Sequence, residues 1–194
     1  SLHRQRLIKY YKVITPEIDI IQNIYDKSRL IELAASIEIQ VPRTFFLKST
    51  DDPIIKNLSF PVIIKGCNGL NFFKTFKRKV FLAENEGSLK EQLYKISKDF
   101  DISATFIQEL IPNDKSSRTV SFTAFCVKGK ILTFWMGIKI REHPIRFGTA
   151  TLCRSVLIEE LKEPSAQLIK ALNYTGVCEI EYIKHPEDNK YKLI

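Results

Sequence analysis

Charged side chains stand at the ends of short apolar segments, where they could bind an anionic ligand. The strand-like run Pro61–Ile64 ends on Lys65 and is followed by the turn-forming loop Gly66–Gly69. Branched residues are typical of a packed strand, so the lysine would be a charge fixed at the end of a rigid element. A lysine in this position is typical of a phosphate site, and a solvated lysine at a strand end is the alternative.

A late segment, Val177–Ile183, carries Glu179 and Glu181 two residues apart. In a strand these carboxylates project from one face, while the apolar residues between them fill the other face. Two carboxylates on one face repel each other unless they are solvated or bridged by a cation. Mg²⁺ prefers such oxygen ligands together with substrate phosphates. The pattern predicts either a magnesium site or a strand with one wet face.

Two further cationic positions are notable. Lys139 and Arg141 share a face at the end of a strand predicted from Lys130 to about Ile140, because strand side chains alternate. Lys27 occupies the first position of a helix for which Asp26 is the predicted N-cap. A cation there is unfavourable with the helix dipole unless an anion lies nearby.

The composition indicates a soluble globular protein that can build a proper core. The 194 residues are 44% hydrophobic and 27% charged, with a net charge of +8. No apolar run approaches the ~20 residues of a membrane span, and the N-terminus resembles no signal peptide, so we expect a cytoplasmic protein. The four cysteines form no C-x-x-C pair and the three histidines are not spaced for zinc, which favours free thiols.

The positive net charge leaves a nucleic-acid partner open. Its densest segment is Lys74–Lys79. No interleaved aromatic platform accompanies it, so we interpret this segment as a solvated loop.

The elements needed to position the charged residues fall into two groups. The first group contains helices and strands predicted at 26–37, 44–47, 60–65, a strand pair at 72–73 and 80–82, a helix opened by the capping box Ser88–Glu91, and a strand at 104–108. Pro112 interrupts the pattern, and we interpret 108–114 as a crossover. The second group contains a strand from Thr119, a Lys128-Gly129 turn, the 130–140 strand, a helix at 164–172, and strands at 177–183 and 191–194.

The order of these features resembles the ATP-grasp superfamily. The segments that carry the resemblance are Asp26-Lys27, Phe60–Lys65, Phe106–Ile111, Gly176–Tyr182 and Tyr191–Ile194. A further stretch, Gly137–Pro144 with Phe147–Thr151, is similar to the branch that contains D-aspartate ligase and related carboxylate–amine ligases. Carbamoyl-phosphate synthase large chains are more distant relatives.

The resemblance implies an α+β ATP-grasp fold, with two α+β lobes that hold a nucleotide between them. Residues 1–25 would be a remnant of the preATP-grasp region or a linker. The N-terminal lobe would be 26–108, with a lid at about 44–107, and the C-terminal lobe 109–194 would be incomplete. Because the chain stops inside a predicted strand, we expect a fragment truncated at both ends.

The resemblance also implies residue roles. Lys27 and Lys65 would contact nucleotide phosphates, and Glu181 would bind Mg²⁺. The remaining roles are adenine binding by Gln108, Glu109, Leu110 and Ile111, ribose binding by Asp114, and neutralisation of the phosphoryl group and substrate carboxylate by Lys139 and Arg141. The chain departs from the family in ending at Ile194, one position before the second metal-binding glutamate, and in reducing the glycine-rich loop to Gly66 and Gly69.

The implied activity is that of an ATP-dependent carboxylate–amine (or thiol) ligase acting through an acyl phosphate. ATP and Mg²⁺ would be required. The partners would be small-molecule carboxylate and amine substrates rather than nucleic acid or a membrane. The resemblance also allows a homodimer. Two alternatives are a non-catalytic basic module that binds nucleic acid or nucleotide, and a degenerate scaffold that binds partners but not ATP. The joint presence of Lys27, Lys65 and Glu181 favours the ligase.

Overall fold

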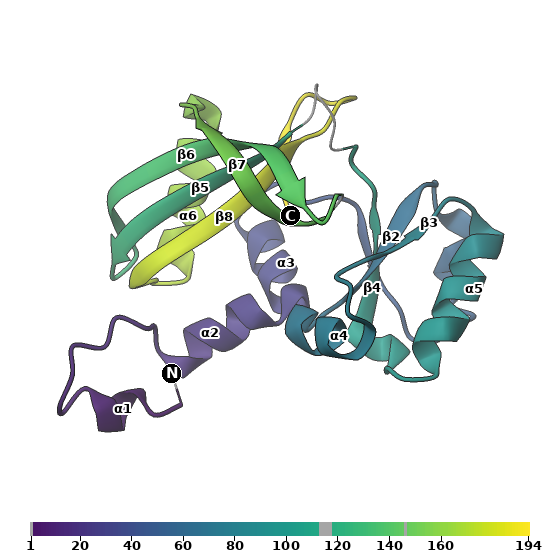
Figure 1. Cartoon of the computed structure of the whole chain (residues 1–194), viewed down its shortest axis with the longest axis horizontal. Coiled ribbons are helices and arrows are strands. Elements are labelled where there is room, and N and C mark those ends of the chain that lie inside the picture. Colours follow the sequence, from purple (N-terminus) through teal and green to yellow (C-terminus); the bar gives the residue numbers. More distant parts are fainter. Residues whose placement is uncertain (1, 113–117, 146) are drawn as a thin grey trace.

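The computed structural model describes residues 2–112, 118–145 and 147–194, which form two lobes, each built around an antiparallel sheet (Figure 1). Before the first sheet lie helices α1 (Arg4–Leu7), α2 (Ile18–Tyr25) and α3 (Lys27–Ser36). The α+β class predicted from the sequence is confirmed. No helix among the described residues is both long and apolar enough to cross a membrane.

The first lobe has a four-stranded sheet in the order β1-β4-β2-β3. Its strands and helices are β1 (Thr44–Phe46), β2 (Val62–Gly66), α4 (Gly69–Phe76), β3 (Phe81–Ala83), α5 (Glu86–Ser97) and β4 (Thr105–Glu109). Helix α4 lies against β2, and α5 lies against β3. Together they cover one side of the sheet and form a core with it that includes Ile64 of β2, Phe72 of α4 and Leu93 of α5.

The second lobe has a five-stranded sheet in the order β7-β6-β5-β8-β9. Its elements are β5 (Thr119–Val127), β6 (Lys130–His143), β7 (Thr149–Ser155), α6 (Lys162–Ala171), β8 (Gly176–Lys184) and β9 (Tyr191–Leu193). The alternation expected for β8 is confirmed, because Ile180 and Tyr182 lie in the core.

Helix α3 connects the two lobes. Its Ala34 packs in the same core as Phe122 and Leu168 of the second lobe. Its first turn is held by the first lobe, since the Lys27 N–H donates to the Cys67 carbonyl at 2.9 Å. The predicted N-cap is confirmed, because Asp26 Oδ1 accepts from the Ser28 N–H at 3.0 Å. The lobe boundaries at 26–108 and 109–194 remain a prediction, and the cores show that α3 contributes apolar residues across that division.

The strand predicted at Phe72–Phe73 is wrong, because these residues lie in helix α4. Asn68 begins the helix by accepting the Asn71 N–H at 3.0 Å. Phe72 and Phe76, four residues apart, face the same side, and both rings contact Phe81. The i, i+4 spacing of these phenylalanines is a helical signal, whereas the adjacent pair Phe72–Phe73 by itself predicts a strand.

The start of α5 also differs from the prediction. Ser88 is not the N-cap, and the helix begins at Glu86 after Asn85. The Ser88 N–H donates to Asn85 Oδ1 at 2.9 Å, and the Asn85 N–H donates to Ser88 Oγ at 3.1 Å. This reciprocal capping satisfies free N–H groups at the start of a helix that begins about one turn earlier than expected.

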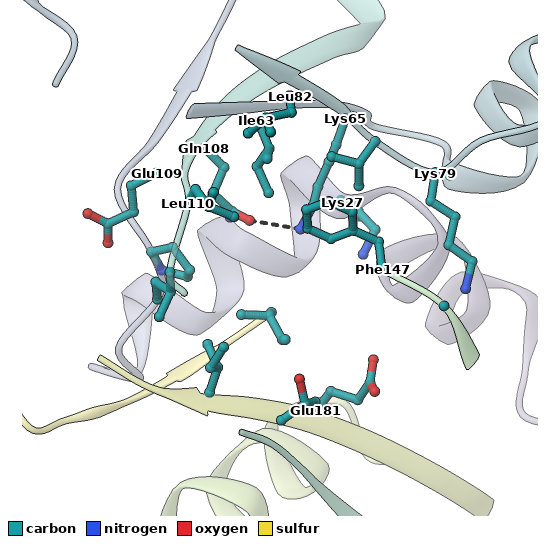
Figure 2. A pocket seen from close by; sticks show the side chains of 18 of the residues that line it. Lys27, Ile63, Lys65, Lys79, Leu82, Gln108, Glu109, Leu110, Phe147 and Glu181 are labelled. Carbon is teal, nitrogen blue, oxygen red and sulfur yellow. Dashed lines mark hydrogen bonds between the residues drawn. The ribbon is translucent and has the colours of Figure 1, made fainter. Parts of the chain in front are cut away.

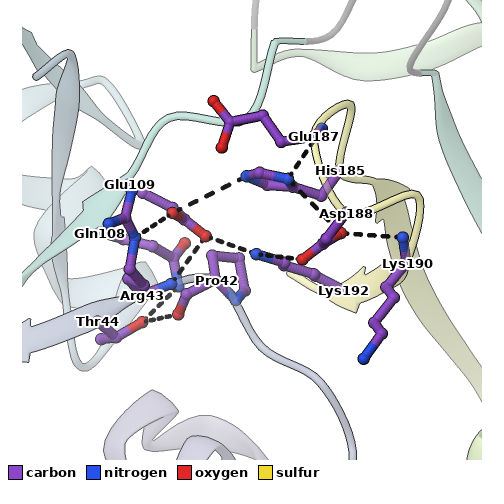
Figure 3. Close-up of polar contacts among 10 residues, drawn as sticks. All are labelled: Pro42, Arg43, Thr44, Gln108, Glu109, His185, Glu187, Asp188, Lys190 and Lys192. Atoms are coloured by element: carbon purple, nitrogen blue, oxygen red, sulfur yellow. Dashed lines mark hydrogen bonds and ion pairs between the residues drawn. The ribbon is translucent and has the colours of Figure 1, made fainter. Parts of the chain in front are cut away.

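A buried carboxylate joins the two lobes next to the crossover (Figure 3). Glu109, 7% exposed at the end of β4, accepts from Arg43 Nε at 2.6 Å and from Lys192 Nζ of β9 at 3.0 Å. Burial alone would raise the pKa of Glu109, but the hydrogen bonds from Arg43 and Lys192 lower it below its usual range. Lys192 is itself buried and also lies 3.4 Å from Asp188 Oδ2.

We predict that Glu109→Gln lowers the free energy of unfolding by roughly 2–4 kcal/mol at neutral pH, because Lys192 would lose its buried partner. The loss should shrink in acid, since the depressed pKa means that the contribution of Glu109 disappears as pH falls through the folded-state pKa. Urea unfolding measures both effects. Glu91→Gln, which breaks only the exposed pair with Lys95, is the control and should cost less than about 1 kcal/mol. Equal losses in the two variants would contradict the prediction.

Candidate functional site

A cavity of about 820 Å³ lies between the two lobes (Figure 2). Its walls come from α3, β2, α4, β3, the end of β4, β6 and β8. Most of the residues for which a binding role was predicted line it, namely Lys27, Lys65, Gln108, Glu109, Leu110, Ile111, Lys139 and Glu181. The fold therefore brings together side chains from both lobes at the place where a ligand could be enclosed.

One wall of the cavity is strongly positive. Lys65 extends from β2, and its Nζ donates to Gln108 Oε1 at 2.9 Å. Gln108 is fixed in turn, because its Nε2 donates to Thr44 Oγ1 at 2.9 Å. Burial and the nearby charge of Lys27 lower the pKa of Lys65 to about 7, although Glu181 opposes the shift. An ammonium group with such a pKa is desolvated and lacks a full counter-charge.

Two more lysines face the same space. Burial lowers the pKa of Lys27, an effect that Glu181 opposes and that Lys79 reinforces. Figure 2 shows Lys27, Lys65 and Lys79 on one side of the cavity and Glu181 on the other. Three cations thus gather on one wall of the cavity, where they favour binding of a polyanion, while Glu84, Glu109, Glu142 and Glu181 also belong to the lining.

Next to the lysines the cavity has an apolar part. Ile63, Leu82, Leu110 and Phe147 line it from β2, β3, the end of β4 and the β6–β7 connection. A flat apolar group could lie there with one end directed at the lysines. Lys27 and Lys65 would then hold the anionic end of the same ligand.

The opposite wall carries Lys139 between two carboxylates. Its Nζ lies 3.2 Å from Glu181 Oε1 and 3.8 Å from Glu142 Oε2. It also donates to the Gly148 carbonyl at 3.4 Å. Lys139 is nearly buried, whereas the side chain of Glu181 is 39% exposed. One carboxylate is therefore accessible from the cavity and could serve as a ligand to a cation.

The expectation that Lys139 and Arg141 share a face is wrong. The pairing of β6 with β7 shifts between Lys139 and Arg141 and again between Arg141 and Glu142. These irregularities interrupt the period of two, so Glu142 lines the cavity and Arg141 is exposed outside it. The role predicted for Arg141 remains untested by this placement.

The sequence assigned no role to several cavity residues, among them Lys79, Glu142 and Phe147. Lys79 belongs to the segment 74–79 that we interpreted as a solvated loop, and only the fold of α4 brings it to the cavity. Glu142 had no local signal, since a strand bulge cannot be read from alternation. Asp114, predicted to meet the ribose, lies outside the described residues.

A metal could be held only in part by protein groups. Among the described residues, no cluster of three histidine, cysteine, aspartate or glutamate side chains is suited to a metal ion. Glu181 and Glu142, on either side of Lys139, both line the cavity and offer carboxylate oxygens. Mg²⁺ commonly uses one or two carboxylates and takes its other ligands from phosphates and water, so these residues fit such a site.

Comparison with known proteins shows similarity only at the level of structure. No protein-family model matches the chain, and no curated protein matches it. It is similar to the biotin carboxylase domain of Hydrogenobacter thermophilus 2-oxoglutarate carboxylase, solved with MgADP, ADP and bicarbonate. That match has a TM-score of 0.69 at 18% identity and covers 98% of this chain and 43% of that one.

Two further solved structures are similar. N5-carboxyaminoimidazole synthase from Aspergillus clavatus, in complex with ADP and 5-aminoimidazole ribonucleotide, has a TM-score of 0.71 at 14% identity over 100% of this chain and 48% of that one. L-amino acid ligase from Bacillus licheniformis has a TM-score of 0.70 at 14% identity over 100% and 50%. The chain spans about half the length of these proteins. It has the ATP-grasp fold, as the sequence resemblance predicted.

We predict that binding of an anion such as ADP takes up a proton. Without a bound anion the pKa of Lys65 is about 7, and a neighbouring polyphosphate raises it. Below pH 7 Lys65 is charged in both states, so affinity is highest there and falls as pH rises from about 7 towards 10. Calorimetry at about pH 8, in buffers with different heats of ionisation, measures the uptake. Lys65→Met should abolish it, and equal uptake by both proteins would contradict the assignment.

Proposed function

We propose that this chain is the nucleotide-binding part of an ATP-dependent ligase that joins a carboxylate to an amine, or to a thiol, through an acyl phosphate. One observation carries the proposal: Lys27, Lys65 and Lys79 converge beside an apolar slot in the cavity between the two lobes of an ATP-grasp fold. The similarity of the stretch Gly137–Pro144 to the D-aspartate ligase branch supports the choice of carboxylate and amine as substrates.

In this proposal ATP lies across the cavity. Lys27 and Lys65 bind its phosphates, which supply the negative charge that these desolvated groups lack. Gln108, Glu109, Leu110 and Ile111 border the end of the apolar slot and hold the adenine edge. The ribose contact assigned to Asp114 remains a prediction from the resemblance.

Glu181 and Glu142 are the carboxylates that would hold Mg²⁺ near the phosphates. Glu181 acts electrostatically on both Lys27 and Lys65, so its carboxylate lies close to where the phosphates would be bound. When bound, Mg²⁺ would neutralise charge that develops during phosphoryl transfer.

In this proposal Lys139 acts on the reacting groups. In the reaction a substrate carboxylate oxygen attacks the γ-phosphorus of ATP and ADP leaves; an amine nitrogen then attacks the acyl carbon, phosphate leaves, and the amine loses a proton. The Lys139 ammonium would orient the carboxylate and stabilise the transferred phosphoryl group. Enclosure between the lobes would protect the acyl phosphate from water. Arg141, exposed outside the cavity, keeps its predicted contact with substrate as a proposal.

We predict that Lys65→Met and Lys27→Met each weaken ADP binding by about ten- to hundredfold, because each removes a charge-assisted contact. Calorimetry with and without Mg²⁺ measures the affinity. Lys12→Met changes an exposed lysine outside the cavity and is the matched control for net charge. Equal effects of all three substitutions would contradict the site. Nucleic-acid binding that is steeply salt-dependent, without any ADP binding, would instead support the basic-module alternative.

A second prediction tests the intermediate. With the whole protein, ATP and Mg²⁺, hydroxylamine should trap the acyl phosphate as a hydroxamate when the correct carboxylate is supplied. Lys139→Met should lower the yield by about a hundredfold, while Lys12→Met should leave it unchanged. Ligation of the same carboxylate without any hydroxamate would show that the reaction takes another route.

A further inference from the structure

Lys65 is held beside the cavity without a negatively charged partner. Its Nζ donates to Gln108 Oε1 at 2.9 Å, and an amide oxygen carries no net charge. Within residues 2–112, 118–145 and 147–194 this lysine forms no ion pair. Glu181 acts on Lys65 from across the cavity, but its Oε1 lies 3.2 Å from Lys139 Nζ. Lys65 therefore lacks the close counter-charge that keeps a desolvated lysine protonated.

The surroundings of Lys65 favour its neutral amine. Burial and the positive charge of Lys27, from α3, lower the pKa of Lys65 to about 7, and Glu181 of β8 opposes the shift. Lys79 acts on Lys27 in the same direction and lies on the same side of the cavity (Figure 2). At about pH 8 Lys65 is therefore mainly an amine with a free electron pair. A lysine in that state is a nucleophile, whereas a solvated lysine stays protonated.

A small electrophile can reach this amine, and the surroundings would stabilise an anionic product. The Lys65 side chain is only partly buried and lines the cavity of about 820 Å³. Ile63 and Leu82 make the neighbouring wall apolar, which suits an uncharged reactant. Lys27 and Lys79, on the same side of the cavity, would attract a negative charge attached to the Lys65 nitrogen. The site therefore favours an electrophile that enters as a neutral molecule and becomes an anion on reaction.

We propose that Lys65 is a site of reversible carbamate formation with carbon dioxide. The nitrogen electron pair attacks the carbon atom of CO₂, an N–C bond forms, and the electrons of one C–O π bond move to oxygen. The nitrogen then loses one proton to water, so the amine and CO₂ give a carbamate anion and H⁺. The remaining N–H can still donate to Gln108 Oε1, because Gln108 is held in place by Thr44.

The carbamate would make nucleotide binding respond to carbon dioxide. It places a negative charge on the wall of the cavity that attracts phosphates, so a carbamate and a nucleotide exclude each other there. This consequence rests on the proposed function, whereas the reaction of Lys65 with CO₂ does not.

Nuclear magnetic resonance with ¹³C-bicarbonate at about pH 8 detects the carbamate, and alkylation with triethyloxonium traps it for peptide mass spectrometry. We expect trapped carbamate on Lys65 at a level about tenfold or more above that on the exposed Lys12, because solvated lysines stay protonated at this pH. An α-amino group also reacts with CO₂, and peptide mapping separates its signal. A level on Lys65 no higher than on Lys12 would overturn the proposal.

Lys65→Arg is the matched variant, because a guanidinium stays protonated and does not react with CO₂. It should abolish the resonance assigned to Lys65, and Lys12→Arg should leave that resonance unchanged. At constant dissolved CO₂, a change from about pH 8 to about pH 6 should lower the resonance by about tenfold or more, because the amine of Lys65 becomes protonated. A resonance that persists in Lys65→Arg, or that does not fall in acid, would overturn the proposal. The trapped peptide of the unsubstituted protein keeps the test decisive if Lys65→Arg perturbs folding.

ADP separates this inference from the proposed function. Excess ADP should suppress the carbamate of Lys65. Bicarbonate should weaken ADP binding to the unsubstituted protein by about twofold or more relative to chloride at equal ionic strength, but should not weaken binding to Lys65→Arg. Equal weakening in both proteins would mean simple competition between anions and would overturn the link to nucleotide binding. Failure of the unsubstituted protein to bind ADP would refute the proposed function, while the mass spectrum would still establish or refute the carbamate.

Discussion

The cavity between the lobes depends on one buried carboxylate. Glu109 neutralises Arg43, just before β1, and Lys192, in β9, so two segments from opposite ends of the chain must meet at the end of β4. A buried charge without a partner is costly, so this ion pair favours the arrangement in which β9 lies beside the end of β4. The same residue forms part of the cavity lining, so the contact that joins the lobes also defines one wall of the site.

The charge of Glu109 is neutralised by its ion pairs, whereas the charges of Lys27 and Lys65 in the cavity are only partly neutralised. Lys27 and Lys65 lose hydration on burial, and Glu181 only partly compensates. The folded chain therefore carries an unfavourable concentration of positive charge that a polyanion would relieve. This is the physical reason for assigning a nucleotide to the cavity, and it explains why the net charge of +8 does not by itself indicate a nucleic-acid partner.

The second sheet supplies the cavity wall that faces the lysines. A bulge in β6 brings Glu142 next to Lys139, and the absence of a side chain at Gly137 allows Trp135 to lie on the same face. Lys139, Glu142 and Glu181 therefore lie together on strands whose register is fixed by backbone pairing. Such a platform is rigid, which favours precise placement of a small ligand.

The sequence alone determined the strand that ends at Lys65, the N-cap at Asp26, the two-faced strand around Glu181, and the order of segments that identified the fold. These features follow from periodicity and capping within a few residues. Tertiary structure alone decided that Glu142 replaces Arg141 at the cavity, that Lys79 faces it, and that Glu109 meets Lys192, 83 residues away. Bulges, burial and ion pairs depend on contacts between distant segments, and a local pattern does not contain them.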